Sequence, residues 1–416
     1  MPSYPYYTEP THTTGAVTVG GAGARTTATS STEGRLVVDA VDKVFLLEPN
    51  KHPLVSLLTN VGRVWDGKAW KGSSVAKAST GNPEFKWFED VYGARYTKAT
   101  TVSSNTEIHV AASAYIFTVG DIVKNARTGE NMLVTTVATG GDTTELTVTR
   151  AYGTTTTAAT AVGDGLFIIG NANAENTGAR NSNTTQTSPE TNYTQIWKTT
   201  IALSGTEDAA KLYGGRDLPY LRGKKATEHA LDIERSFWFG EKRTGTDGTY
   251  TSMPIRTTGG VLEFINGGNS YVQNQGGALT APDMNTFLRE AFTYGNNRKM
   301  LFAGGLVLQA INEISRGQLQ TKMDDTTYGV KISQWTTTFG TVDIVHNPLF
   351  VEDYAGYGFL LDMECFRYRY MEGRDTKLMT NVQAPDVDGI VDQYLTEAGL
   401  ERKQASRHAI IKGVTA

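Results

Sequence analysis

The chain has 416 residues, of which 39% are hydrophobic and 20% charged, and its formal net charge is -4. At roughly 150 residues per domain this length allows two or three cores. The charge excludes both the basic field of nucleic-acid-binding proteins and an acidic solvating tail. The single cysteine, Cys365, excludes an internal disulfide, fits assembly in a reducing cytoplasm, and is interpreted as a buried small residue.

The first part of the chain predicts an arm rather than a domain. Met1–Gly23 lacks the basic start and apolar stretch of a secretory signal, and no run of about 18 apolar residues predicts a membrane span. Residues 1 to about 34 are rich in Thr, Gly, Ala and Ser, so we expect them to become ordered only against a neighbour. A short amphipathic piece is predicted over Leu36–Leu47, and a second apolar piece over Leu54–Leu58.

Residues 63–99 scatter aromatic side chains among lysines and glycines without a sustained period, which predicts a long hairpin-like excursion. With about 18 residues per arm it would reach roughly 60 Å at about 3.3 Å per residue, far enough to touch another subunit. Lysines and aromatic residues also occur together in nucleic-acid-binding surfaces. Four acidic residues are mixed in here, so the pattern favours a contact between subunits: Asp66, Glu84, Glu89 and Asp90.

Residues 100–172 are poor in charge and alternate short strand signals with glycine-containing turns, which predicts a small β-barrel or β-sandwich. Residues 173–193 then have the composition of a loop. The expected strands are Glu107–Val110, Ile122–Val123, Met132–Val137, Glu145–Arg150 and Leu166–Ile169.

A long helix is predicted from Asp217 to Glu241, after a shorter helical signal that begins at Ser204. Proline at position 219 suits a first turn and suggests a kink there. The apolar stripe consists of Ala226, Ala230, Ile233 and Phe237, with Leu231 and Trp238 beside it. The opposite face is charged, and His229 is assigned to it as a solvated or ion-paired residue. We predict that Ile233, Phe237 and Trp238 pack on a sheet formed partly by residues 390–412.

The remainder predicts an α+β domain followed by short strands. The expected helices are Pro282–Tyr294 and Leu306–Arg316. The expected strands are Met300–Ala303, Val330–Thr338, Val342–His346, Gly358–Met363, Arg367–Met371, Ile390–Thr396, Gly399–Arg402 and Ala409–Lys412.

No residue is predicted to be catalytic, cofactor-binding or metal-binding. Gly20–Gly23 follows no strand and lacks the lysine of a phosphate loop, and no Gly-x-Ser-x-Gly elbow occurs. The neighbouring pairs Asp324-Asp325 and Glu352-Asp353 are interpreted as solvated loop residues, because a glycosidase needs its carboxylates across a cleft. The histidines lack the spacing of a zinc site; they are His12, His52, His109, His229, His346 and His408. These absences favour a protein whose function is its shape.

The order of these parts resembles the major capsid proteins of tailed bacteriophages with the Hong Kong 97-like fold, in the podophage branch that carries an inserted β-domain. The resemblance covers residues 35–416, and its departures are Gly214-Gly215 and Pro219 at the start of the long helix. Some members form a covalent cross-link; Lys68, Lys71 and Lys77 are available here, but nothing marks their partners. The residues that carry the resemblance are Asn192–Trp197 followed by Ile201–Thr206, Glu228–Arg235 with Gly240, Arg256–Val261, Leu395–Glu401 and His408–Gly413.

The resemblance implies a division of the chain into seven parts. These are an N-terminal arm (1–62), the first limb of an extended loop (63–99), an inserted β-rich domain (100–173), the return limb of the loop (174–200), a peripheral domain with a spine helix (201–253), an axial domain (254–385) and C-terminal strands returning to the peripheral domain (386–416).

The implied function is self-assembly, as hexamers and pentamers, into an icosahedral head shell that encloses double-stranded DNA. The implied partners are further copies of the chain, with scaffolding, portal and decoration proteins, and DNA touched only weakly at the inner surface. Assembly is expected in the host cytoplasm and residence in the virion, with no cofactor and no membrane. Two alternatives stay open: a tail-fibre or adhesin subunit, which would show a fixed repeat, and a carbohydrate-active enzyme, which would show a carboxylate pair across a cleft.

Overall fold

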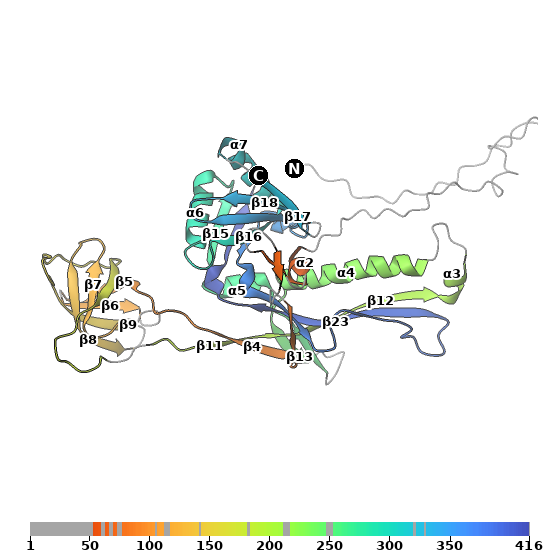
Figure 1. Cartoon of the computed structure of the whole chain (residues 1–416), viewed down its shortest axis with the longest axis horizontal. Coiled ribbons are helices and arrows are strands. Elements are labelled where there is room, and N and C mark those ends of the chain that lie inside the picture. The colour runs from red at the N-terminus through yellow and green to blue at the C-terminus, as the bar shows by residue number, and fades with distance from the viewer. Residues whose placement is uncertain are drawn as a thin grey trace, which may run out of the picture. The chain divides into compact units, whose positions relative to one another are not determined.

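The computed structural model describes residues 53–59, 63–65, 70–72, 77–104, 106–111, 117–140, 143–180, 184–210, 217–246, 253–318, 322–327 and 330–415 (Figure 1). The predicted arm over residues 1–34, the helix over Leu36–Leu47 and the Gly20–Gly23 turn lie outside these residues. Two compact units form, a smaller one from Thr199–Glu228 and Leu378–Gln393 and a larger one from Lys51–Lys198, His229–Lys377 and Tyr394–Ala416. No helix in the described part has the length and apolarity to cross a bilayer.

A seven-stranded mixed sheet organises much of the larger unit. Its order is β15 (Tyr271–Gly277), β24 (Ala409–Val414), β20 (Gly358–Leu361), β16 (Arg298–Ala303), β19 (Thr341–His346), β18 (Val330–Thr336) and β17 (Lys322–Thr327). Three helices accompany it, namely α5 (Val261–Gly267), α6 (Ala281–Ala291) and α7 (Gly305–Gln318). Thr280 and Asp283 close a capping box at the start of α6, and Phe287 and Val307 are fully buried against the sheet's apolar residues.

A second sheet joins strands from distant parts of the chain. Its order is β12 (Gln195–Ser204), β23 (Gly389–Arg402), β21 (Phe366–Met371) and β3 (Lys77–Thr80), and β22 (Lys377–Met379) also pairs with β23. Both β12 and β23, like the long helix α4 (Asp217–Phe239), contribute residues to both units. Three 3-10 turns complete the larger unit: Glu352–Tyr354, Met363–Cys365 and Ala405–Arg407.

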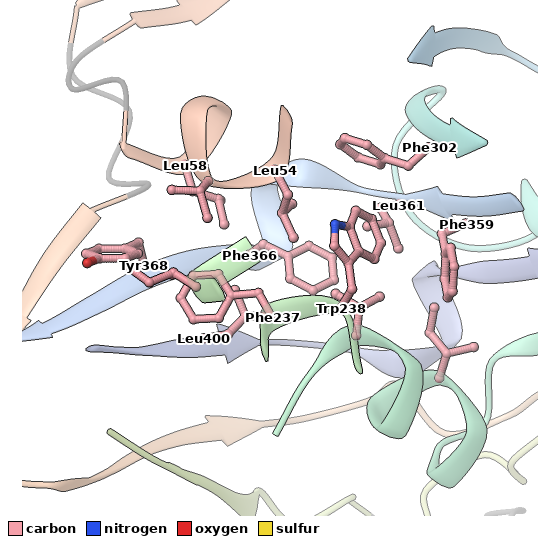
Figure 2. Packing of buried hydrophobic residues seen from close by; sticks show 14 of the residues in the cluster. Leu54, Leu58, Phe237, Trp238, Phe302, Phe359, Leu361, Phe366, Tyr368 and Leu400 are labelled. Atoms are coloured by element: carbon pink, nitrogen blue, oxygen red, sulfur yellow. The ribbon is translucent and has the colours of Figure 1, made fainter. Parts of the chain in front are cut away.

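The C-terminal half of α4 packs into the main core, as its apolar spacing predicts. Ile233, Phe237 and Trp238 are at most 3% exposed and share one cluster with Leu400 of β23 and Ile410 of β24. Figure 2 shows the indole of Trp238 among aromatic rings, and its centroid lies 5.1 Å from those of Phe302 and Phe359 and 5.0 Å from that of Phe350. Edge-to-face rings at these distances add to the stabilisation from burial alone. The predicted packing of α4 on residues 390–412 is therefore confirmed.

The smaller unit is held by polar contacts around β23 and α4. The short helix α3 (Gly205–Ala209) begins where the Ser204 hydroxyl accepts the Glu207 N–H at 3.3 Å. In α4, Pro219 lies in the first turn, where its missing N–H leaves no bond unmade. The Arg222 guanidinium lies 2.6 Å from the carboxylate of Asp392, which is fully buried and also accepts the Asn381 N–H at 3.1 Å.

The predicted β-rich block is a closed six-stranded barrel with its own core. Its order is β10 (Gly165–Asn171), β5 (Tyr96–Val102), β6 (Glu107–Ala111), β9 (Thr143–Thr149), β8 (Asn131–Gly140) and β7 (Asp121–Asn125). Alternate residues of the strands point inward, including Ile108, Val110, Met132, Val134 and Leu166, each at most 1% exposed. Two ion pairs secure the loop before β10: Arg150 with the fully buried Glu130, and Arg127 with Asp164.

The remaining described elements are a short helix and three two-stranded ribbons. They are α2 (Pro53–Thr59), the ribbon of β1 (Arg63–Trp65) and β2 (Trp70–Gly72), the hairpin of β4 (Glu84–Glu89) and β11 (Ser188–Tyr193), and the ribbon of β13 (Arg243–Thr246) and β14 (Pro254–Thr257).

The structure differs from the sequence prediction in several places. Residues 188–193, expected at the end of a loop, form β11, which pairs with β4. The barrel begins at Tyr96, and β5 has no apolar alternation that would reveal it. Strand β23 is continuous through Gly399, where two strands were expected. Strand β24 lies in the seven-stranded sheet rather than beside β23, whereas β21 lies beside β23. Asp324-Asp325, expected in a loop, belong to β17, where a hydrogen-bonded neighbour outweighs their poor strand propensity.

Candidate assembly surface

The hairpin of β4 and β11 carries the most exposed apolar side chains. Its register pairs Glu84 with Tyr193 and Glu89 with Ser188, and neither strand pairs with any other described strand. Phe85 and Trp87 are buried, whereas Phe88 is 71% exposed. Val91 and Tyr92, just beyond β4, are 63% and 102% exposed, and with Phe88 we call them the hairpin surface. A two-stranded ribbon is marginal in water, so this one depends on packing against other parts of the protein or other molecules.

Asn192 fixes the base of the hairpin. Its side chain is fully buried, and its Nδ2 donates to the Leu400 carbonyl at 2.7 Å, to the Gly259 carbonyl at 3.1 Å and to the Thr258 hydroxyl at 3.2 Å. Its Oδ1 accepts the N–H groups of Gly259 and Tyr193, both at 2.9 Å. One amide therefore joins β11, β23 and the turn after β14, with every donor and acceptor used.

Glycine at position 399 allows the base of the hairpin to cross β23 at close range. A Cβ at Gly399 would lie 2.5 Å from the Tyr193 carbonyl oxygen and 2.8 Å from the Phe85 ring. A Cβ carbon essentially never lies this close to a nonbonded atom, so a side chain here would displace the hairpin. A glycine that resembles a strand break in the sequence is thus a site of close backbone approach.

Glu234 anchors α2 to α4 from within the core. This fully buried carboxylate accepts the N–H groups of Leu54 at 2.9 Å and Val55 at 2.6 Å, and the indole N–H of Trp238 at 2.8 Å. Burial raises the pKa of Glu234 to about 7, and the three N–H donors act in the opposite direction. The free N–H groups of the first turn of α2 are thereby satisfied by a residue 180 positions away.

The barrel presents a second exposed apolar group on β5 and β10. Tyr96 and Phe167 are 41% and 45% exposed, with ring centroids 4.6 Å apart, and Ile169 is 57% exposed. These side chains point away from the barrel core, where Leu166 and Ile168 lie. The barrel thus offers a contact surface of its own.

Two of the six histidines named above, His229 and His408, lie in buried hydrogen-bond networks. His229 is 2% exposed, 2.7 Å from the Thr396 hydroxyl, and burial lowers its pKa, so its assignment to the solvated face was wrong. It lies one turn from Ile233, hence on the buried side of α4. His408 is 1% exposed; its Nδ1 accepts the Asp362 N–H, which places the proton on the Nε2 that lies 3.0 Å from the Lys403 carbonyl. Burial lowers the pKa of His408 to about 3.

The remaining candidate residues are dispersed. Burial raises the pKa of Cys365 to about 12, and at 3% exposure it is the buried small residue predicted. Glu352 and Asp353 are exposed, as predicted. Lys77 pairs with Asp375 at 2.5 Å, and within the described residues no group of three metal-ligating side chains forms. The others are separated: His346 ends β19, His109 lies in the barrel, and His12, His52 and Lys68 fall outside the described residues.

Asn192 and Glu234 lie in the segments used for the resemblance, but their roles were not predicted. Both are polar residues whose hydrogen-bond partners lie far away in sequence, and a single sequence carries no signal for such pairs. Their burial is visible only once the strands and helices have been placed.

Comparison with known proteins assigns the family. Residues 17–415 match the family described as SU10 major capsid protein. The major capsid protein of Pseudomonas phage PaMx41 is 27% identical over 323 residues, which is 74% of each chain. A chain of the cyanophage A-1(L) capsid asymmetric unit has the same fold, with a TM-score of 0.52 at 10% identity, over 93% of this chain and 100% of that one. The chain therefore belongs to the SU10 major capsid protein family, with a Hong Kong 97-like fold, and is a structural protein of the phage capsid rather than an enzyme.

Proposed function

We propose that the chain assembles as hexamers and pentamers into the icosahedral head shell that encloses the double-stranded DNA of a tailed phage. The observation that supports this most directly is the hairpin surface, since large apolar side chains at 63% to 102% exposure within five residues of the chain are typical of a surface that another molecule covers. The family assignment favours a second copy of the chain as that neighbour.

In this proposal the parts of the chain have distinct roles. Residues 1–62 form the N-terminal arm, and residues 63–99 with 174–200 form the two limbs of the extended loop, of which the β4–β11 hairpin is the paired portion. Residues 201–253 with 386–402 form the peripheral domain, and residues 254–385 form the axial domain around hexamer and pentamer centres, with β24 in its sheet. The inserted domain, proposed over residues 100–173 and forming a barrel that begins at Tyr96, lies on the outer surface, where its exposed aromatic residues contact neighbours or a decoration protein.

The net charge and the single cysteine support two further parts of the proposal, namely weak contact with DNA and assembly in the cytoplasm. A net charge of -4 suits a container that touches packaged DNA only weakly, because few phosphates would be neutralised. A single buried cysteine suits assembly in the host cytoplasm. Scaffolding and portal proteins complete the proposed set of partners.

Replacing Phe88 and Tyr92 together by aspartate tests the role of the hairpin surface. An aromatic anchor at an interface contributes about 2 kcal/mol or more, so losing two should raise the concentration needed for assembly by roughly a thousandfold. We expect soluble protein with unchanged circular dichroism that sediments as small species, where the parent forms shells visible by electron microscopy. The matched control is Val162→Asp, at an equally exposed valine in the barrel loop, which should assemble like the parent. Shells from the double variant would contradict the proposal.

A further inference from the structure

Gln404 adopts a backbone conformation that is rare for its residue type. Its φ of 54° and ψ of 72° place it in the left-handed region, which disfavours residues with a Cβ. In this conformation its N–H donates to Glu89 Oε1 at 2.9 Å, and its side-chain Nε2 donates to the Asp90 carbonyl at 3.1 Å. Glu89 is the last residue of β4, and Asp90 follows it directly. A strained residue of the body thus holds the distal end of the hairpin.

The body side of this contact is rigid. The residue before Gln404, Lys403, donates its N–H to the Cys365 carbonyl at 3.1 Å, and its own carbonyl lies 3.0 Å from Nε2 of His408. The residue after it, Ala405, accepts the Ser270 hydroxyl at 2.5 Å. The strained conformation is therefore imposed from both sides, as such conformations require.

The hairpin side of the contact is weaker. Glu89 is partly exposed, and its other hydrogen bond comes from the indole of Trp87 in the same strand, at 2.8 Å. Two hydrogen bonds therefore join this end of the hairpin to the body, whereas the buried side chain of Asn192 makes four to the body at the base. Phe85, opposite Asn192, lies four residues before Glu89, or about 13 Å along the strand at about 3.3 Å per residue.

We propose that Glu89 and Gln404 form a releasable latch that sets the direction of the hairpin about a fixed pivot at Asn192. With the latch closed, the hairpin surface points in one direction; with it open, the hairpin swings while its base stays attached. Glu89 and Gln404 are then positioning residues for assembly, and this last step rests on the proposed function. Release removes two partly exposed hydrogen bonds, relieves the strain at Gln404 and uncovers Trp87, which is 7% exposed and lies outside the main apolar cluster.

The latch is tested on the unassembled full-length protein by electron–electron distance measurement between spin labels. One label is placed at Thr187→Cys beside the distal end of the hairpin and one at Asp353→Cys on the body, both exposed positions, while the native Cys365 is buried. We expect a narrow distance distribution for the parent, and a broad one for Glu89→Ala at an unchanged unfolding midpoint. Glu89→Gln retains a carbonyl acceptor and should restore much of the narrow distribution.

Two further variants separate the latch from general stability. Glu84→Ala is the matched control, because it removes a carboxylate of the same strand that pairs only with Lys86 at 3.4 Å among the described residues; its distribution should stay narrow. Gln404→Gly loses the side-chain bond to Asp90 and the strain but keeps the N–H donor to Glu89, so its distribution should be narrower than that of Glu89→Ala. A distribution for Glu89→Ala as narrow as the parent's, or an equally broad one for Glu84→Ala, would overturn the latch.

The distance measurement tests the latch, and shell formation tests the proposed function, so either proposal can be refuted without the other. If the parent forms no shells, the proposed function fails while the distances still test the latch. If the latch is correct and shells form, Glu89→Ala should give a wider range of particle sizes by electron microscopy at a similar total yield, because neighbouring contacts no longer form at one angle. Uniform particles from Glu89→Ala would show that hairpin direction does not govern assembly.

Discussion

At the scale of single residues, Glu234 couples core packing to protonation. An unfolded glutamate titrates near its ordinary value of about 4.5, whereas burial raises the pKa of Glu234 in the folded protein to about 7. The folded state therefore binds the proton more tightly, so its stabilising effect is complete below about pH 4.5 and is lost as the pH rises through about 7. His229 and His408 act oppositely, because their lowered pKa values contribute stability that is lost as the pH falls below about 6.5.

Replacing Glu234 by glutamine separates these contributions. His229 and His408 contribute equally to the stability of the parent and of the variant. Their contributions therefore cancel in the difference between the two free energies of unfolding. We expect this difference to change by about 3 kcal/mol between pH 4.5 and 7.5, with the parent losing stability relative to Glu234→Gln as the pH rises. Urea titrations across this range measure it. A flat difference for Glu234→Gln would show that the pKa of Glu234 is the same in the folded and the unfolded protein.

At the scale of elements, the helix α4 shows what the sequence predicts and what it leaves out. Its apolar period identified Ile233, Phe237 and Trp238 as core residues because each contributes to burial by itself. The period could not identify His229 and Glu234, which widen the buried arc through hydrogen bonds to Thr396 and Leu54, 167 and 180 residues away. The same limit applies to Asn192 and Gly399, whose roles arise only where β11 crosses β23.

Truncating Phe237 tests whether this stripe is the core face on which assembly depends. Phe237 is fully buried, with its ring centroid 5.9 Å from that of Trp197 and 5.8 Å from that of Tyr368. Phe237→Ala should cost about 3 to 5 kcal/mol, a large share of the roughly 5 to 15 kcal/mol that stabilises a domain. We expect insoluble or shell-less protein by sedimentation. Lys225→Ala, which removes only a surface pair with Glu228 at 2.6 Å, should give the parental particle yield. Equal particle yields from Phe237→Ala and Lys225→Ala would show that this stripe is not the core face of α4.

At the scale of the whole molecule, the barrel is a domain inserted into a chain that is otherwise built from long-range contacts. Its strands close on themselves and its core residues contact one another, whereas each of the two sheets of the main body pairs segments more than a hundred residues apart, Tyr271 with Ala409 in one and Lys77 with Tyr368 in the other. The barrel, apart from β5, was predictable from the sequence because its strands follow one another along the chain and are separated by glycine-containing turns. Entry and exit lie close together, since the Ile168 N–H donates to the Arg95 carbonyl at 2.9 Å.

These features predict that residues 95–172 fold when expressed alone. A barrel of this size is marginal on apolar burial, so the buried pair of Arg150 with Glu130 is decisive. Removing Glu130 would take away the carboxylate that pairs with Arg150 and that accepts the N–H groups of Ala151 and Ala158, at about 3 to 5 kcal/mol. We expect dispersed amide resonances and a cooperative thermal transition for the isolated barrel, and their loss in Glu130→Ala but not in Glu107→Ala at a partly exposed position of β6. Joining Ala94 to Asn173 through a short glycine–serine linker should likewise leave the main body folded. If the isolated barrel and the deletion variant were both unfolded, the barrel would have to be an integral part of the main core.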